Sequence, residues 1–149
     1  IGGFTTGRKE IIDMLRQRSR PYLFSNSIPP SVAGAGIKMF EMMERSNELQ
    51  DTLHDNTNYF VEKMKAAGFD IKPTQSSICA VMLYDAKLSQ DMASKLLDEG
   101  IYVTGFYYPV VPKDLARIRV QISAGHKKEH LDKCIAAFTK IGKELGVLK

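Results

Sequence analysis

The sequence predicts an α/β chain in which helices pack on a small, mostly antiparallel sheet, preceded by a long linking helix. Residues 31–67 contain no proline, and from Leu53 to Ala67 one helical stripe recurs at steps of three and four residues. Six consecutive apolar residues at 78–83 and strict alternation at 117–123 are typical of strands. Helical periodicity returns between and after these strands, which favours helices covering a sheet.

Residues 8–18 are predicted to form the first helix, because their apolar side chains are spaced three to four apart and Thr6 is placed to cap them. Pro21 is expected to end this helix. The short apolar stretch at 22–24 then reads as a buried strand.

Ser27, followed by two prolines, marks the start of the long helix, since proline is tolerated in a first helical turn. Gly68 provides the stop at its other end. We expect a bend near Ser46 and Asn47.

In the second half, residues 78–83 are predicted to be a strand covered on both faces. A helix at 89–99 is expected to end at Gly100 and to lead into a second strand at 101–103. Residues 107–115 contain two prolines and are predicted to form a loop.

The third predicted strand, 117–123, alternates between apolar residues on one face and Arg117, Arg119 and other polar residues on the opposite face. A last helix is predicted over residues 128–145, with Gly146 as its stop. The chain is therefore expected to divide into a tail of a larger layer and a compact helix-on-sheet domain.

Composition limits the function classes. The chain has 44% hydrophobic and 26% charged residues, which is ordinary for a globular protein, and no apolar run long enough to span a bilayer. Its formal charge of +4 suits an anionic ligand such as a phosphate or coenzyme A but is too weak to indicate nucleic-acid binding. We expect neither nucleic acid nor membrane as a partner. The segment after Ile1 does not resemble a signal peptide, and a targeting segment on a parent chain stays open.

The two cysteines, Cys79 and Cys134, lie far apart, each within an apolar run. The sequence favours small buried hydrophobic side chains over a disulfide or a metal site. This usage suits a reducing compartment, the cytoplasm or, in a eukaryote, the mitochondrial matrix.

His126, Glu129 and His130 match the pattern of inverted zinc peptidases. Only 19 residues follow to supply a third ligand, and Glu129 at a helix start is explained by the helix dipole. We therefore expect no metal.

Two small groups of polar residues are candidates for ligand binding. Arg117 and Arg119 share the polar face of a strand, where they are either surface charges or a bidentate clamp for a carboxylate. Ser25 and Asn26, like Ser27, precede a helix start and are either capping residues or donors to a phosphate.

Several segments together resemble the α-oxoamine synthases, a family of fold-type-I pyridoxal-phosphate enzymes. The resemblance covers essentially the whole chain and is carried by Gly2-Gly3-Phe4-Thr5-Thr6-Gly7, by residues 15–27, by Pro109-Val110-Val111-Pro112-Lys113 and by residues 116–126. It implies the C-terminal part of a fold-type-I transferase. Residues 1–45 would then be the tail of the large cofactor-binding domain with the start of the linking helix, and 46–149 the small domain.

The resemblance also implies roles for the candidate residues. Arg119 matches the arginine that binds the substrate carboxylate, and Arg117 becomes a structural or gating residue. Ser25 and Asn26 match positions that reach the phosphate of pyridoxal phosphate in the partner subunit of a homodimer, which leaves Ser27 as the cap.

The family's Schiff-base lysine would lie upstream of Ile1, and the sequence lacks an initiator Met. We therefore expect a C-terminal fragment that has no catalytic residue of its own and is inactive by itself.

The implied reaction is a Claisen-type condensation of glycine with acetyl-coenzyme A, which yields 2-amino-3-oxobutyrate and coenzyme A. Its reverse belongs to threonine catabolism. Two alternatives stay open: another α-oxoamine synthase with different amino-acid and acyl specificity, or a non-catalytic dimerisation module derived from one.

Overall fold

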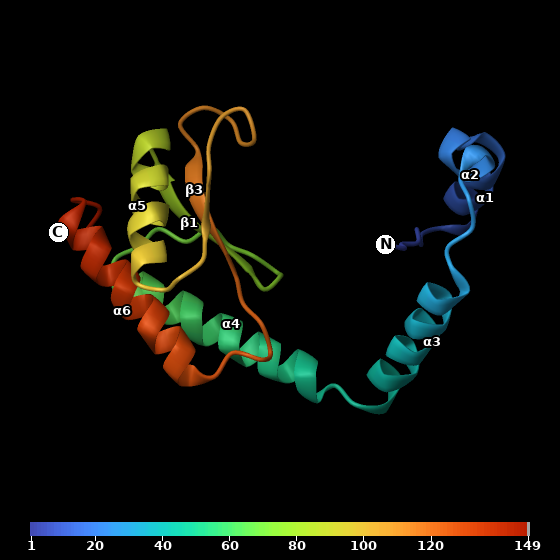
Figure 1. The fold of residues 1–149 in the computed structure, drawn as a ribbon, viewed down its shortest axis with the longest axis horizontal. Helices are drawn as coiled ribbons and strands as arrows, with labels where there is room; N and C mark the ends of the chain where they lie inside the picture. The colour runs from blue at the N-terminus through green and yellow to red at the C-terminus, as the bar shows by residue number, and fades with distance from the viewer. Residues whose placement is uncertain (149) are drawn as a thin grey trace. The chain divides into compact units, whose positions relative to one another are not determined.

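The computed structural model describes residues 1–148. Its internal contacts divide the chain into two units, an N-terminal unit, Ile1–Asn47, and a C-terminal unit, Glu48–Lys149 (Figure 1). Their assignment to the large and small domains of a longer enzyme stays a prediction.

The N-terminal unit consists of three helices: α1 (Lys9–Arg18), α2 (Arg20–Phe24) and α3 (Pro30–Arg45). The predicted strand at 22–24 is wrong, because these residues form the end of α2. Pro21 lies in the first turn of α2, where no intrahelical amide donor is needed, so it starts a helix as well as following one.

Both expected N-caps in this unit are wrong. Helix α1 begins after Arg8 and α3 begins after Pro29, and neither helix has a side-chain cap. Thr6 and Ser27 each lie two residues before those N-cap positions. The N-cap position of α3 is Pro29, with φ −57° and ψ 141°, and a proline side chain has no oxygen that could accept from the first helical amides.

The predicted long helix is divided in two, α3 and α4 (Glu48–Ala66). The interruption falls at Ser46 and Asn47, where a bend was expected, but Ser46 has extended backbone angles and the helix ends there. Ser and Asn compete for backbone hydrogen bonds with their own side chains, which weakens a helix at such a pair.

The C-terminal unit places three helices against an antiparallel sheet of three strands in the order β1-β3-β2. Figure 1 shows α5 alongside β1 and β3. After α4, the elements are β1 (Ile78–Tyr84), α5 (Ala86–Asp98), β2 (Thr104–Phe106), β3 (Ala116–Gln121) and α6 (Lys128–Glu144). The small antiparallel sheet with packed helices confirms the predicted fold class.

One face of this sheet carries the hydrophobic core. Alternate residues of β1 and β3 meet the apolar sides of α4, α5 and α6. The side chains with least exposure include Phe60, Met64, Cys79, Val81, Met92, Leu96, Ile118, Phe138 and Ile141. The predicted stops at Gly68, Gly100 and Gly146 are confirmed, since each has a positive φ just beyond a helix.

The strand predictions need two corrections. The second strand was expected at 101–103, but pairing with β3 begins only at Thr104, because the Ile101 amide instead donates to the carbonyl of Leu96 at the end of α5. The first strand was expected to be covered on both faces. On its outward face this holds at Met82, which is 3% exposed, but not at Ile78 at the strand's beginning, which is 38% exposed.

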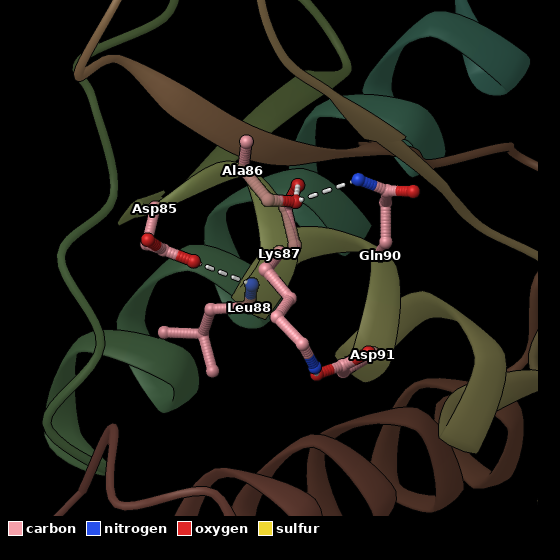
Figure 2. A network of polar contacts seen from close by, with 7 residues as sticks. Asp85, Ala86, Lys87, Leu88, Gln90 and Asp91 are labelled. Atoms are coloured by element: carbon pink, nitrogen blue, oxygen red, sulfur yellow. Dashed lines mark hydrogen bonds and ion pairs between the residues drawn. The ribbon is translucent and has the colours of Figure 1, made fainter.

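Helix α5 begins three residues earlier than predicted. Asp85 caps it by accepting a hydrogen bond from the Leu88 amide at 2.7 Å. Figure 2 shows this cap together with the Gln90 side chain donating to the Ala86 carbonyl and the Lys87–Asp91 ion pair. The cap therefore starts the helix immediately after the end of β1 in the sequence.

The two units differ sharply in burial, and this predicts different local stabilities. No residue of α1, α2 or α3 is buried in the described chain, and isolated helices of this length are marginal in water. In the 149-residue chain, hydrogen exchange of amides in α1–α3 is therefore expected to be about a thousandfold or more faster than in β1 and β3. Equal protection in both units, measured by NMR, would contradict this.

Candidate functional site

Arg117 and Arg119 lie on β3 with their side chains on the face opposite the core, as their alternation with Ile118 and Val120 predicted. Across the sheet, Arg119 faces Ala80 on β1 and Thr104 on β2. Arg117 lies in the next row of the same face.

The two guanidinium groups have different surroundings. The Nε of Arg117 donates to the carbonyl of Leu115 at 3.0 Å, which ties this side chain to the backbone two residues earlier. The Cζ of Arg119 lies 4.8 Å from the centre of the Phe106 ring. Among residues 1–148, Arg119 has no carboxylate partner, so its charge is open to a ligand.

Arg119 also borders a cavity of the C-terminal unit with a volume of about 570 Å³. The cavity lies among the segment before β2, the end of β3 and the start of α6. It is lined by Gly100–Thr104, Phe106, Arg119–Ile122, His126, His130, Leu131, Lys133 and Cys134. Among these lining residues, Arg119 and Lys133 are cationic, two are histidines and none is acidic. This electrostatic environment favours an anionic ligand.

Sequence reasoning missed most of this lining. It identified Arg119 but gave no ligand role to Thr104, Phe106, His126 or Lys133. A weak signal was present, because Thr104 and Phe106 alternate along the chain as strand residues do. This signal did not identify the two residues, because the strand was predicted three residues too early in the sequence.

The two histidines organise the turn into α6. The Nδ1 of His126 accepts from the Ser123 amide, and the Nδ1 of His130 accepts from the Lys127 amide, each at 3.2 Å. Asn56 on α4 donates to the carbonyls of Ser123 and His126 and fixes the same turn. Over the part of the chain that the structure describes, no three His, Cys, Asp or Glu side chains are grouped to hold a metal ion.

Ser25 and Asn26 lie in the N-terminal unit, in the exposed segment between α2 and α3. The Ser25 hydroxyl donates to the carbonyl of Asn26 at 3.3 Å, and Ser25 has an extended backbone. Arg119 belongs to the C-terminal unit, so Ser25 and Asn26 lie in a different unit from the arginine.

Both cysteines are free thiols, as predicted, and burial raises the pKa of each from its ordinary value of 9.0 to about 11. Cys79 lies in the core and Cys134 is half-buried at the cavity. The neutral thiols therefore contribute to stability below about pH 9, and this contribution is lost as the pH rises toward 11.

Alkylation should report this directly. At pH 8 only about 0.1% of each thiol is ionised, so iodoacetamide is expected to label the folded chain about a hundredfold more slowly than the chain in denaturant. The labelling rate of each cysteine at pH 8 is measured by mass spectrometry. If either cysteine of the folded chain reacted as fast as it does in the denatured chain, the burial described above would be contradicted.

Comparison with known proteins supports the resemblance noted in the sequence. The chain is 54% identical over 147 residues to the 2-amino-3-ketobutyrate coenzyme A ligase of Escherichia coli K12, covering 99% of this chain and 37% of that protein. It is 46% identical over 148 residues to the 8-amino-7-oxononanoate synthase of Thermosipho melanesiensis, of which it covers 38%. The chain thus spans well under half the length of these relatives.

A solved structure agrees. The serine palmitoyltransferase of S. paucimobilis with a bound PLP–myriocin aldimine superposes with a TM-score of 0.83 at 30% identity, over 91% of this chain and 35% of that one. No helix among the described residues is long and apolar enough to cross a membrane. The model of the family described as aminotransferase class I and II matches residues 1–138. The chain therefore belongs to the aminotransferase class I and II family.

Proposed function

We propose that this chain is part of a pyridoxal-phosphate-dependent acyltransferase, the parent protein, which condenses glycine with acetyl-coenzyme A to 2-amino-3-oxobutyrate and coenzyme A. The proposal is supported by the 54% identity to a 2-amino-3-ketobutyrate coenzyme A ligase and by the family match. The observation that carries it is Arg119, an exposed guanidinium without a carboxylate partner among residues 1–148, beside a cavity without acidic residues.

In this proposal Arg119 binds the carboxylate of glycine. A guanidinium presents two parallel N–H donors that match the two oxygens of a carboxylate, which fixes both the position and the orientation of the amino acid. Holding a small substrate this way lowers the entropic cost of bringing its α-carbon to the acyl donor. Arg117 serves the structure of the loop before β3, in keeping with its bond to Leu115.

The residues of the N-terminal unit suit the cofactor's phosphate. Ser25 offers a hydroxyl and Asn26 an amide, both exposed, and the Ser25 hydroxyl has only a long local hydrogen bond at 3.3 Å. We propose that these two residues donate to the phosphate of pyridoxal phosphate bound by the partner subunit of a homodimer. When bound, this cofactor supplies the electron sink that makes the α-proton of glycine removable.

Threonine catabolism is the proposed context, with the cytoplasm or the mitochondrial matrix of a eukaryote as the proposed compartment. The two free thiols suit such a reducing environment. Another α-oxoamine synthase is the second candidate, because the 46% identity to an 8-amino-7-oxononanoate synthase is only moderately lower.

The test is a substrate panel on the purified parent protein loaded with pyridoxal phosphate. Glycine, alanine and serine are each combined with acetyl-, hexanoyl- and palmitoyl-coenzyme A, and release of the free coenzyme A thiol is followed. We expect the highest kcat/KM for glycine with acetyl-coenzyme A. A higher value for another pair would favour the second candidate, and no thiol release with any pair would leave a non-catalytic dimerisation module.

A further inference from the structure

We propose that Phe106 is a positioning residue that holds the Arg119 guanidinium in the orientation needed to bind the substrate carboxylate. The inference rests on the proposed function and extends it to a residue on a neighbouring strand. It starts from the strand register. Thr104 pairs with Arg119 and Phe106 pairs with Arg117, so Phe106 lies diagonally from Arg119 on the same face of the sheet.

The contact between the two side chains is specific. The Cζ of Arg119 lies 4.8 Å from the Phe106 ring centre, within the range of a cation–π interaction. With no carboxylate to anchor it in the described chain, the guanidinium has this ring as its fixed neighbour. A long arginine side chain loses rotamer freedom when it binds a ligand, and a preformed stack reduces that loss.

Phe106 does not contribute to the described hydrophobic core. It is partly buried, but it belongs neither to this core nor to the side chains packed against it. Its backbone is nevertheless held firmly, because the adjacent Gly105 lies so close to α5 that a Cβ there would come within 2.8 Å of the Ser89 carbonyl oxygen. A fixed strand therefore presents a large apolar ring to a charged group and not to the core.

The test uses the full-length parent protein and separates the amino acid from the acyl donor. Phe106→Leu is expected to raise the KM for glycine about five- to twentyfold while the KM for acetyl-coenzyme A stays within twofold. Phe106→Tyr keeps the ring and is expected to stay within twofold for both. Tyr59→Leu is the matched control, since Tyr59 on α4 also carries lysine ammonium groups over its ring but lies outside the cavity lining.

A double-mutant cycle gives the sharper readout. If the ring acts through the guanidinium, Phe106→Leu should add less than twofold to the glycine KM in an Arg119→Lys background. In the 149-residue chain, the δ-protons of Arg119 should show an upfield ring-current shift by NMR that Phe106→Leu removes.

The outcomes separate the two claims. If Arg119→Lys raises the glycine KM but Phe106→Leu does not, or if the two effects multiply, the role of Phe106 is overturned and the proposed function stands. A Tyr59→Leu effect on the glycine KM equal to that of Phe106→Leu would also overturn it, because the change would then be general. If Arg119→Lys itself leaves the glycine KM unchanged, the proposed carboxylate site fails and the role of Phe106 with it.

Discussion

Replacing Arg119 by lysine in the parent protein is expected to raise the KM for glycine about a hundredfold, which corresponds to about 2.7 kcal/mol of lost binding. Lysine keeps the positive charge but loses the planar pair of donors, so the bidentate contact with the carboxylate disappears. The measurement is steady-state kinetics with glycine varied at saturating acetyl-coenzyme A.

Arg117→Lys is the matched control, two residues away on the same strand face. Its expected effect on the glycine KM is at most about threefold, because the Arg117 Nε is already bonded to the Leu115 carbonyl. Similar small effects of both substitutions would remove Arg119 from the substrate site. A larger effect at Arg117 would exchange the two roles.

Phe138→Ala is expected to lower the free energy of unfolding of the C-terminal unit by about 3–5 kcal/mol. The Phe138 side chain is 0% exposed and its ring meets Phe69 edge-on, with centroids 5.9 Å apart. Removing the ring leaves a cavity where α6 packs on the core and also deletes this aromatic contact. Urea unfolding followed by circular dichroism measures the change.

Tyr102→Ala is the control for this substitution, because Tyr102 is 86% exposed. It removes a similar aromatic group from the surface and is expected to change the free energy of unfolding by no more than about 0.5 kcal/mol. A loss below about 1.5 kcal/mol for Phe138→Ala would mean that α6 does not pack on the sheet as described.

The candidate site was only partly predictable. Alternation along 117–123 placed both arginines on the polar face of a strand, since this period is a local property of the chain. Periodicity could not choose between the two arginines, and Arg119 was selected only through the family resemblance. The structure adds a physical difference between them, a backbone contact at Arg117 and an aromatic ring beside Arg119.

The fold shows the same division. Helices α1, α5 and α6 were placed by apolar spacing, and glycines marked the ends of α4, α5 and α6. Short segments were less predictable. Residues 22–24 belong to a helix whose first turn contains proline, because three apolar residues carry no period that distinguishes a strand from a helical turn.

By itself, the sequence determined which segments are helices or strands over long stretches and which of their faces are apolar, because these follow from side-chain spacing within a segment. It also determined the family, through segments spread along the whole chain. Only the tertiary structure decided that Phe106 lies beside Arg119 and that the cavity between β3 and the start of α6 lacks acidic residues. These features depend on strand register and on contacts between residues distant in sequence, and no local pattern encodes either.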